Sequence, residues 1–192
     1  IMRNTGICLF VYNRHDHTKK ILRNISECNN FRKFKLYVFG DSYKSDKHND
    51  KNKVSLVRKE ILNFKKINKN IIIKFSKTNL GLYKNLIRGI SYVLKKHSAV
   101  IVLEDDLVVR KNFLNFMYNS LEKYKNKKNV LQISGYSYPI NCNSNKAYFL
   151  NLTSCWGWAT WSDRWINFIK FSKNKNLVQK EYNKIRYDYN KK

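Results

Sequence analysis

A short apolar run that ends in three acidic residues constrains this chain more than any other stretch. The run reads AVIVLEDDLVV and begins at Ala99, and its acids are Glu104, Asp105 and Asp106. β-Branched residues without polar alternation are typical of a strand buried on both faces inside a parallel sheet. The acids would then lie at the carboxyl edge of that sheet, where three carboxylates repel one another unless a cation or hydrogen-bond donors meet them. The run therefore indicates a divalent cation such as Mg²⁺ or Mn²⁺, or acids that only cap the next helix.

Strand-like and helix-like patterns alternate through the first two-thirds of the chain. Short apolar runs predict strands, and apolar residues spaced three and four apart predict helices. The expected strands are 6–12, 36–39, 71–75, 99–104 and 130–134, and the expected helices lie around 21–28, 54–67, 82–94 and 113–124. Asp16 or Thr18 is the expected N-cap of the first helix. This order predicts an α/β fold with a mostly parallel sheet, right-handed crossovers and helices on both faces.

Polar residues follow several of the expected strands. Arg14 and Asp16 follow the first strand, Asp41 the second, Asn79 the third, and the acidic triplet the fourth. Because sheets of this kind bind ligands beyond the carboxyl ends of their strands, these residues are candidates for one binding site. Asp41 could equally be a turn residue after Gly40.

The charge of the chain is extreme. It has 39 Lys and Arg against 13 Asp and Glu, a formal net charge of +26. Such a field attracts nucleic acid, anionic lipid and phosphorylated ligands alike, so a basic protein that binds nucleic acid or an anionic membrane without catalysis is the alternative to an enzyme. Many of the lysines lie beside asparagines, which is typical of solvated surfaces. The sequence has no P-loop and no nucleic-acid recognition motif, so we expect no specific nucleic acid partner.

The sequence shows no apolar run of about 20 residues and no signal peptide, so we expect a cytoplasmic protein, with contact at the inner membrane face as an option. The cysteines Cys8, Cys28, Cys142 and Cys155 have no C-x-x-C spacing, and we expect buried free thiols. His15 and His17 have the spacing of a metal pair, although a polar surface loop is the simpler interpretation.

All four tryptophans lie within ten residues, in the segment SCWGWATWSDRW. A tryptophan has a large apolar face and one N–H donor, which suits core packing as well as stacking on a sugar. On composition alone, core packing is the favoured interpretation.

Seven features together resemble a known family. They are Asn13-Arg14, Gly40-Asp41, Asn79-Leu80-Gly81, Arg88-Gly89, VIVLEDDLVV, Gly157-Trp158-Ala159-Thr160-Trp161 and Arg164-Trp165. The chain resembles glycosyltransferases of the GT-A type, most of all the bacterial family-2-like sugar transferases, and is similar to N-acetylglucosaminyltransferase I. The resemblance implies a Rossmann-like GT-A fold over residues 1–192, with a nucleotide-sugar-binding part at 1–110 and an acceptor-side part at 111–192.

The resemblance also implies a role for each matching residue. Arg14 and Asp41 would contact the base and phosphates of a nucleotide-sugar donor, and Gly81 would leave room for the nucleotide. Glu104 and Asp105 would line the ribose and the donor sugar.

The remaining roles concern the metal and the acceptor. Asp106 would bind Mn²⁺ or Mg²⁺, and the loop from Trp156 to Trp161, with Trp158, would form the floor of the donor-sugar and acceptor site. The implied reaction is inverting: a carboxylate base deprotonates a hydroxyl of a glycan or glycolipid acceptor, which attacks the anomeric carbon in line.

One element of the family pattern is missing. The base in such enzymes is an Asp in a tryptophan-rich segment beyond the GWATW element, and no W-D-x-x-W stretch follows Trp165. The base is therefore unknown, and Asp163 is the nearby candidate although it does not match the motif. With Ile1 as the first residue, we expect a truncated chain with an incomplete acceptor part. Such a chain would bind donor and metal but transfer little sugar.

Overall fold

The computed structural model describes residues 4–137 and 148–189 and shows one six-stranded sheet in the order β3-β2-β1-β4-β6-β5. The strands are β1 (Thr5–Val11), β2 (Lys35–Gly40), β3 (Ile71–Phe75), β4 (Ala99–Glu104), β5 (Ile133–Ser134) and β6 (Trp158–Trp161). The first four are parallel, whereas β6 runs antiparallel to both β4 and β5. The predicted α/β class and mostly parallel sheet are confirmed.

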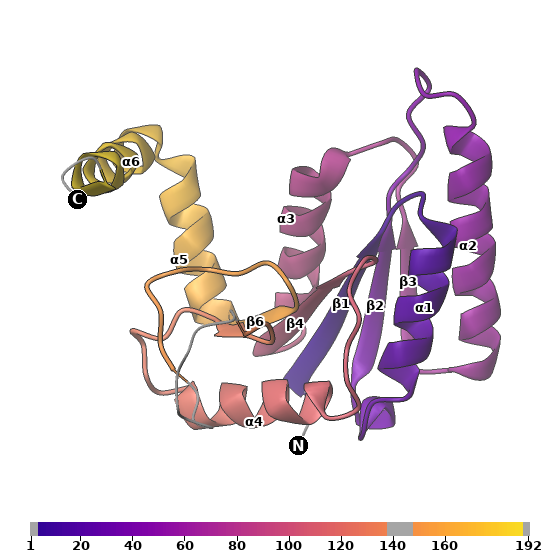
Figure 1. Cartoon of the computed structure of the whole chain (residues 1–192), viewed down its shortest axis with the longest axis horizontal. Helices are drawn as coiled ribbons and strands as arrows, with labels where there is room; N and C mark the ends of the chain where they lie inside the picture. The colour runs from indigo at the N-terminus through magenta and orange to yellow at the C-terminus, as the bar shows by residue number, and fades with distance from the viewer. Residues whose placement is uncertain (1–3, 138–147, 190–192) are drawn as a thin grey trace.

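Helices cover both faces of this sheet (Figure 1). They are α1 (His15–Ser26), α2 (Asp50–Ile67), α3 (Gly81–Leu94), α4 (Phe113–Tyr124), α5 (Ser162–Lys173) and α6 (Lys175–Tyr189), with a short 3₁₀ turn η2 (Phe31–Lys33). The apolar stripes of α1, α2 and α4 pack on one face, and those of α3 and the start of α5 pack on the other. Helix α6 follows α5 away from the sheet. No helix in the described part of the chain has the length and apolar character needed to cross a bilayer.

The two apolar layers follow from strand alternation. In β1, Ile7, Leu9 and Val11 belong to the layer under α1 and α2, whereas Cys8 and Phe10 belong to the layer under α3. Both sets are almost wholly buried, as the absence of polar residues in this strand predicted.

Helix α3 packs closely on the sheet at Gly89. A Cβ atom built at Gly89 would lie 2.6 Å from Cε1 of Phe10 and 3.0 Å from Cδ2 of Phe39, so a larger residue cannot fit without moving those rings. The two rings stack with centroids 5.2 Å apart and form the surface on which α3 rests. Gly89 therefore sets the distance between α3 and the sheet.

Several details differ from the sequence-based expectations. Helix α1 begins at His15 with Arg14 as its N-cap, so Asp16 and Thr18 lie within the helix, and the Thr18 hydroxyl donates to the Arg14 carbonyl at 2.8 Å. The turn after β1 is thus shorter than expected. The strand expected at 130–134 is limited to β5, and 148–150 is irregular. Cys8 and Cys28 are buried free thiols as predicted, whereas Cys155 is exposed and Cys142 lies outside the described residues.

Candidate functional site

The carboxyl ends of four parallel strands meet at one edge of the sheet. The register pairs Phe10 with Glu104, Val11 with Gly40, and Gly40 with Phe75. The segments that follow these strands therefore leave the sheet side by side. This parallel register is why residues that are distant in the sequence, such as Arg14 and the acidic triplet, come together.

An acidic cluster lies at this edge. Glu104 is the last residue of β4, and Asp105 is buried with 3% of its surface exposed. Asp105 accepts a hydrogen bond from the backbone N–H of Tyr12 at 3.4 Å and forms an ion pair with Arg14. The same guanidinium reaches Asp106 Oδ2 at 3.1 Å. The structure thus brings Arg14 together with the acidic triplet.

Burial and mutual repulsion act on these carboxylates. Burial raises the pKa of Asp105, and the opposing effect of Arg14 does not overcome it. Burial, followed by repulsion from Asp106 and Asp105, also raises the pKa of Glu104. Two of the three carboxylates pair with the one guanidinium of Arg14, and repulsion among the three acids remains.

The carboxylates of this cluster suit a divalent cation that a bound substrate also helps to hold. No group of three or more His, Cys, Asp or Glu side chains within residues 4–137 and 148–189 converges as a complete metal site. However, the Asp106 side chain is 47% exposed and borders the buried Asp105. Hard cations such as Mg²⁺ are often held by one or two carboxylates plus substrate phosphates, and this cluster suits that mode.

Asp41 lies further along the same edge and binds the start of α3. Its Oδ1 accepts hydrogen bonds from the N–H groups of Ser42 at 2.8 Å and Leu80 at 2.9 Å, and its Oδ2 accepts one from Gly81 at 3.0 Å. Asp41 is buried, so this is the turn role that its sequence context also allowed. Gly81 has φ +73°, and a Cβ atom there would meet nothing within 4 Å, so the glycine borders open space. A nucleotide contact for either residue stays a prediction.

Sequence reasoning missed Asp50. This residue opens α2, and its carboxylate accepts hydrogen bonds from the Tyr12 hydroxyl, from Asn13 Nδ2 at 2.5 Å and from the Lys44 N–H at 2.7 Å. Burial opposes ionisation of Asp50, but these donors outweigh it and lower its pKa. Burial and the Asp50 carboxylate raise the pKa of Tyr12, which keeps the phenol protonated as a donor. The only sequence signal was an Asp at a helix start inside a hydrophilic loop.

The tryptophan segment is a strand rather than the expected loop from residue 156 to 161. Strand β6 pairs Trp158 with Val102 and Trp161 with Ala99. Trp161 is buried in the core, and its indole N–H donates to the Leu121 carbonyl at 3.2 Å. Because side chains alternate along a strand, Trp158 lies on the opposite face of the sheet from Trp161. Its ring centroid lies 6.3 Å from that of Trp165. Trp158 and Trp161 therefore pack in the two apolar layers on opposite faces of the sheet.

The part of the segment before β6 is exposed. Trp156 is 51% exposed, and its ring meets that of Tyr136 edge to face at a centroid distance of 4.7 Å. Because Trp158 pairs with Val102, two residues before Glu104, Trp156 lies toward the acidic edge of the sheet. Trp156 is thus more exposed than Trp158, which is partly buried, and the predicted sugar contact of Trp158 stays a prediction.

Asp163 lies at the opposite edge of the sheet from the acidic cluster. It follows β6, whose last residue pairs with Ala99 at the start of β4. Its carboxylate forms ion pairs with Lys128 at 2.5 Å and with Arg164 at 2.9 Å. The length of β4 separates it from Glu104, so its position does not support the predicted role of base.

Asp163→Asn is expected to lower the free energy of unfolding by about 1 kcal/mol at pH 7. Burial acts against ionisation, but Lys128 and Arg164 outweigh it and lower the pKa of Asp163 from 3.8 to about 2. The full shift would correspond to roughly 2.4 kcal/mol, and solvent screening of a carboxylate that is 45% exposed reduces it. Because the folded pKa is the lower one, the contribution is complete above about pH 4 and is lost as the pH falls toward 2. Urea unfolding at pH 7 and pH 3 should show the difference between variant and wild type shrinking, and an unchanged difference would contradict the assignment.

Hollows border helices α1 and α2 among the described residues. One of about 250 Å³ borders the acidic cluster between α1 and the chain after β4, and it is lined by Asp16, His17, Lys20, Asp105, Asp106, Leu107 and Val108. His17 faces this hollow, whereas His15 contacts Asp16 at 3.1 Å and Glu60 at 3.5 Å. The two histidines therefore have different neighbours, and no complete metal site of three or more ligands forms around them in the described residues.

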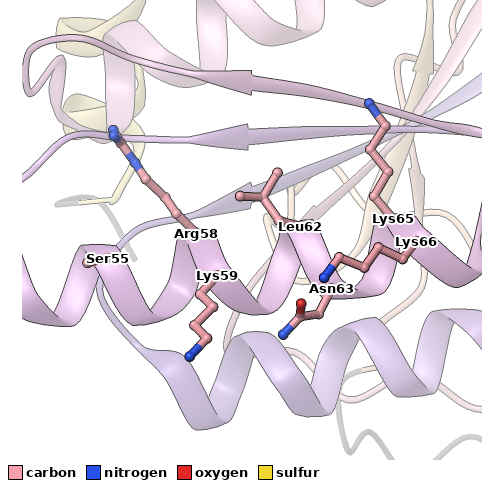
Figure 2. Close-up of a pocket in the computed structure, with 7 residues that line it drawn as sticks. All are labelled: Ser55, Arg58, Lys59, Leu62, Asn63, Lys65 and Lys66. Carbon is pink, nitrogen blue, oxygen red and sulfur yellow. The ribbon is translucent and has the colours of Figure 1, made fainter.

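The second hollow is an open trough of about 790 Å³ along α2 (Figure 2). It is lined by Ser55, Arg58, Lys59, Leu62, Asn63, Lys65 and Lys66. Leu62 lies between Arg58 and Lys65 on the side of the helix nearer the strands, so an apolar patch is bordered by positive charge. The trough contains no residue of the acidic cluster.

The fold and the acidic cluster can be compared with known protein families, and one family model matches this chain. An acidic cluster that pairs with a guanidinium at the carboxyl edge of a mostly parallel sheet lies where sheets of this kind bind ligands. The family model described as glycosyl transferase family 2 matches residues 50–184, which is more than half of the chain. The protein therefore belongs to glycosyl transferase family 2, as the sequence motifs predicted.

The chain is similar to solved structures at low sequence identity and with TM-scores below 0.5. S. aureus TarS, as a structure of its residues 1–349, is 14% identical over 64% of this chain with a TM-score of 0.47. The mannosyltransferase PcManGT from Pyrobaculum calidifontis, in complex with GDP-Man and Mn²⁺, is 15% identical over 63% of this chain with a TM-score of 0.46. The alignment spans 33% of each of those chains. A search of curated proteins found no match.

Proposed function

We propose that this chain binds a nucleoside-diphosphate sugar at the acidic edge and forms the donor side of a transferase that moves the sugar to a hydroxyl group. The observation that carries the proposal is the convergence of Arg14, Asp105 and Asp106 beyond the ends of β1 and β4. Membership of glycosyl transferase family 2 supports the reaction class. The acceptor, a glycan or glycolipid, is proposed from the resemblance of the motifs.

Each residue of the cluster has a defined task in this proposal. Arg14 lies at the start of α1 with its guanidinium partly exposed, so it can pair with the donor's phosphates as well as with the carboxylates. Buried Asp105 holds Arg14 and the Tyr12 backbone in place, and half-buried Glu104 lines the same edge toward the ribose and sugar. Exposed Asp106 would hold the cation.

A Mn²⁺ or Mg²⁺ ion bound there would neutralise the diphosphate leaving group. In line with this, a structure similar in fold, that of PcManGT, contains GDP-Man and Mn²⁺. We propose inversion at the anomeric carbon with a carboxylate base, as the resemblance implies, and we assign no described residue as that base. Location in the cytoplasm and contact with an anionic membrane stay predictions, and the basic border of the trough on α2 would suit such a membrane.

Calorimetric titration tests the donor proposal. We expect the chain to bind a nucleotide-sugar from a panel that includes UDP-GlcNAc and GDP-Man, and to bind it at least tenfold more tightly with Mn²⁺ than with a chelator. Equal affinity under both conditions would contradict the role of the metal. Failure to bind any member of the panel would contradict the donor site, and tight, salt-sensitive binding of an oligonucleotide that Asp106→Ala leaves unchanged would instead favour the non-enzymatic alternative.

A further inference from the structure

Asp50 connects two loops that flank the donor edge. It is 2% exposed and lies at the first position of α2. The donors to its carboxylate come from two separate segments: Tyr12 and Asn13 from the turn after β1, and the Lys44 N–H from the loop after β2. A buried carboxylate with three donors is well satisfied, and its place at a helix start adds the favourable helix dipole.

Tyr12 extends this connection to the acidic cluster. Its hydroxyl donates to Asp50, and its backbone N–H donates to Asp105 Oδ2 at 3.4 Å. Arg14, two residues later, pairs with the same Asp105. The turn at 12–14 is therefore held from one side by Asp50 and from the other by Asp105.

We infer that Asp50 is a positioning residue for donor binding, which fixes the turn that presents Arg14 to the donor's phosphates. The inference rests on the proposed function, and Asp50 acts through Tyr12 and Asn13 because it is itself buried. An asparagine at this position has only one acceptor oxygen, so it can satisfy either Asn13 on the Oδ1 side or Tyr12 and Lys44 on the Oδ2 side, but not both. The turn then gains freedom that donor binding must remove.

The test compares Asp50→Asn and Tyr12→Phe with the control Asp46→Asn. Asp46 is an exposed Asp in the same loop, four residues before Asp50, so it matches the loss of charge without the buried contacts. We expect Asp50→Asn and Tyr12→Phe each to weaken nucleotide-sugar binding by about tenfold in folded protein, and Asp46→Asn to leave it unchanged. Because the two changes break one hydrogen bond, the double variant should lose less than the product of the single losses.

Measuring donor affinity and the unfolding midpoint of the same variants distinguishes a positioning role of Asp50 from a purely structural one. A lowered unfolding midpoint with wild-type affinity for the donor would overturn the inference. Hydrogen exchange of residues 12–14 provides a readout that needs no donor: exchange should be faster in Asp50→Asn and Tyr12→Phe than in Asp46→Asn, and equal exchange would overturn the inference. If the wild type binds no donor, the proposed function fails, whereas faster exchange would still support the role of Asp50 in holding the turn.

Discussion

Asp106→Asn is expected to weaken Mn²⁺-dependent binding of the nucleotide-sugar by about 100-fold. Asp106 is the exposed carboxylate of the acidic cluster, and an amide at this position keeps the shape but loses the charge that a hard cation requires. Loss of residues that only support metal ligands commonly costs 10- to 100-fold in metal affinity, so loss of a ligand should reach the upper end of that range. Binding measured with a chelator present should change by less than threefold.

Glu122→Gln is the matched control for this prediction. Glu122 is also a carboxylate with 47% of its side chain exposed, but it lies on α4 and pairs with Lys125 at 3.1 Å. Its replacement should leave donor affinity unchanged. A comparable loss in both variants would show that Asp106 acts through the general field of the protein and not as a ligand.

Trp161→Ala is expected to reduce the free energy of unfolding by about 3–5 kcal/mol, as large-to-small substitutions of buried aromatic residues do. Trp161 lies in the core, donates to the Leu121 carbonyl, and carries the Arg164 guanidinium 4.1 Å from its ring centroid. A loss of this size is a large part of the stability of a typical domain. Urea unfolding followed by far-UV circular dichroism measures it without relying on tryptophan fluorescence.

Trp156→Ala is the control within the same segment. Trp156 is half exposed, so its removal should cost about 1 kcal/mol or less. If Trp161→Ala does not fold, Trp161→Phe keeps most of the apolar volume and should still lose about 1–2 kcal/mol. Equal costs for the alanine variants at 156 and 161 would contradict the division of this segment into a core part and an exposed part.

Much of the fold was predictable because the central strands are buried on both faces. A strand such as β4 has no polar residue before Glu104, so its pattern could only fit the middle of a sheet. The proximity of Arg14 to the acidic triplet was predictable for the same reason, since parallel strands end at one edge. Local detail at the helix start was less predictable, because both Asp16 and Thr18 are good N-caps by residue type and neither is the N-cap.

The rest depends on tertiary contacts that a single sequence does not display. Asp50 acquires its role from Tyr12, 38 residues earlier, and nothing in the loop around it signals that contact. The tryptophan segment resembled a loop in the sequence because β6 has only four residues, too few to show the alternating pattern of a strand. Asp163 lies close to the tryptophans in sequence, yet the antiparallel direction of β6 carries it to the far edge of the sheet.

That reversed direction has a consequence for how such an enzyme diversifies. In the proposed function, the turns after β1 and β4 recognise the donor's phosphates, whereas Trp156 lies just before β6. Under the proposed function, the segment that carries Trp156 can therefore change in evolution independently of the turns that carry Arg14 and Asp106.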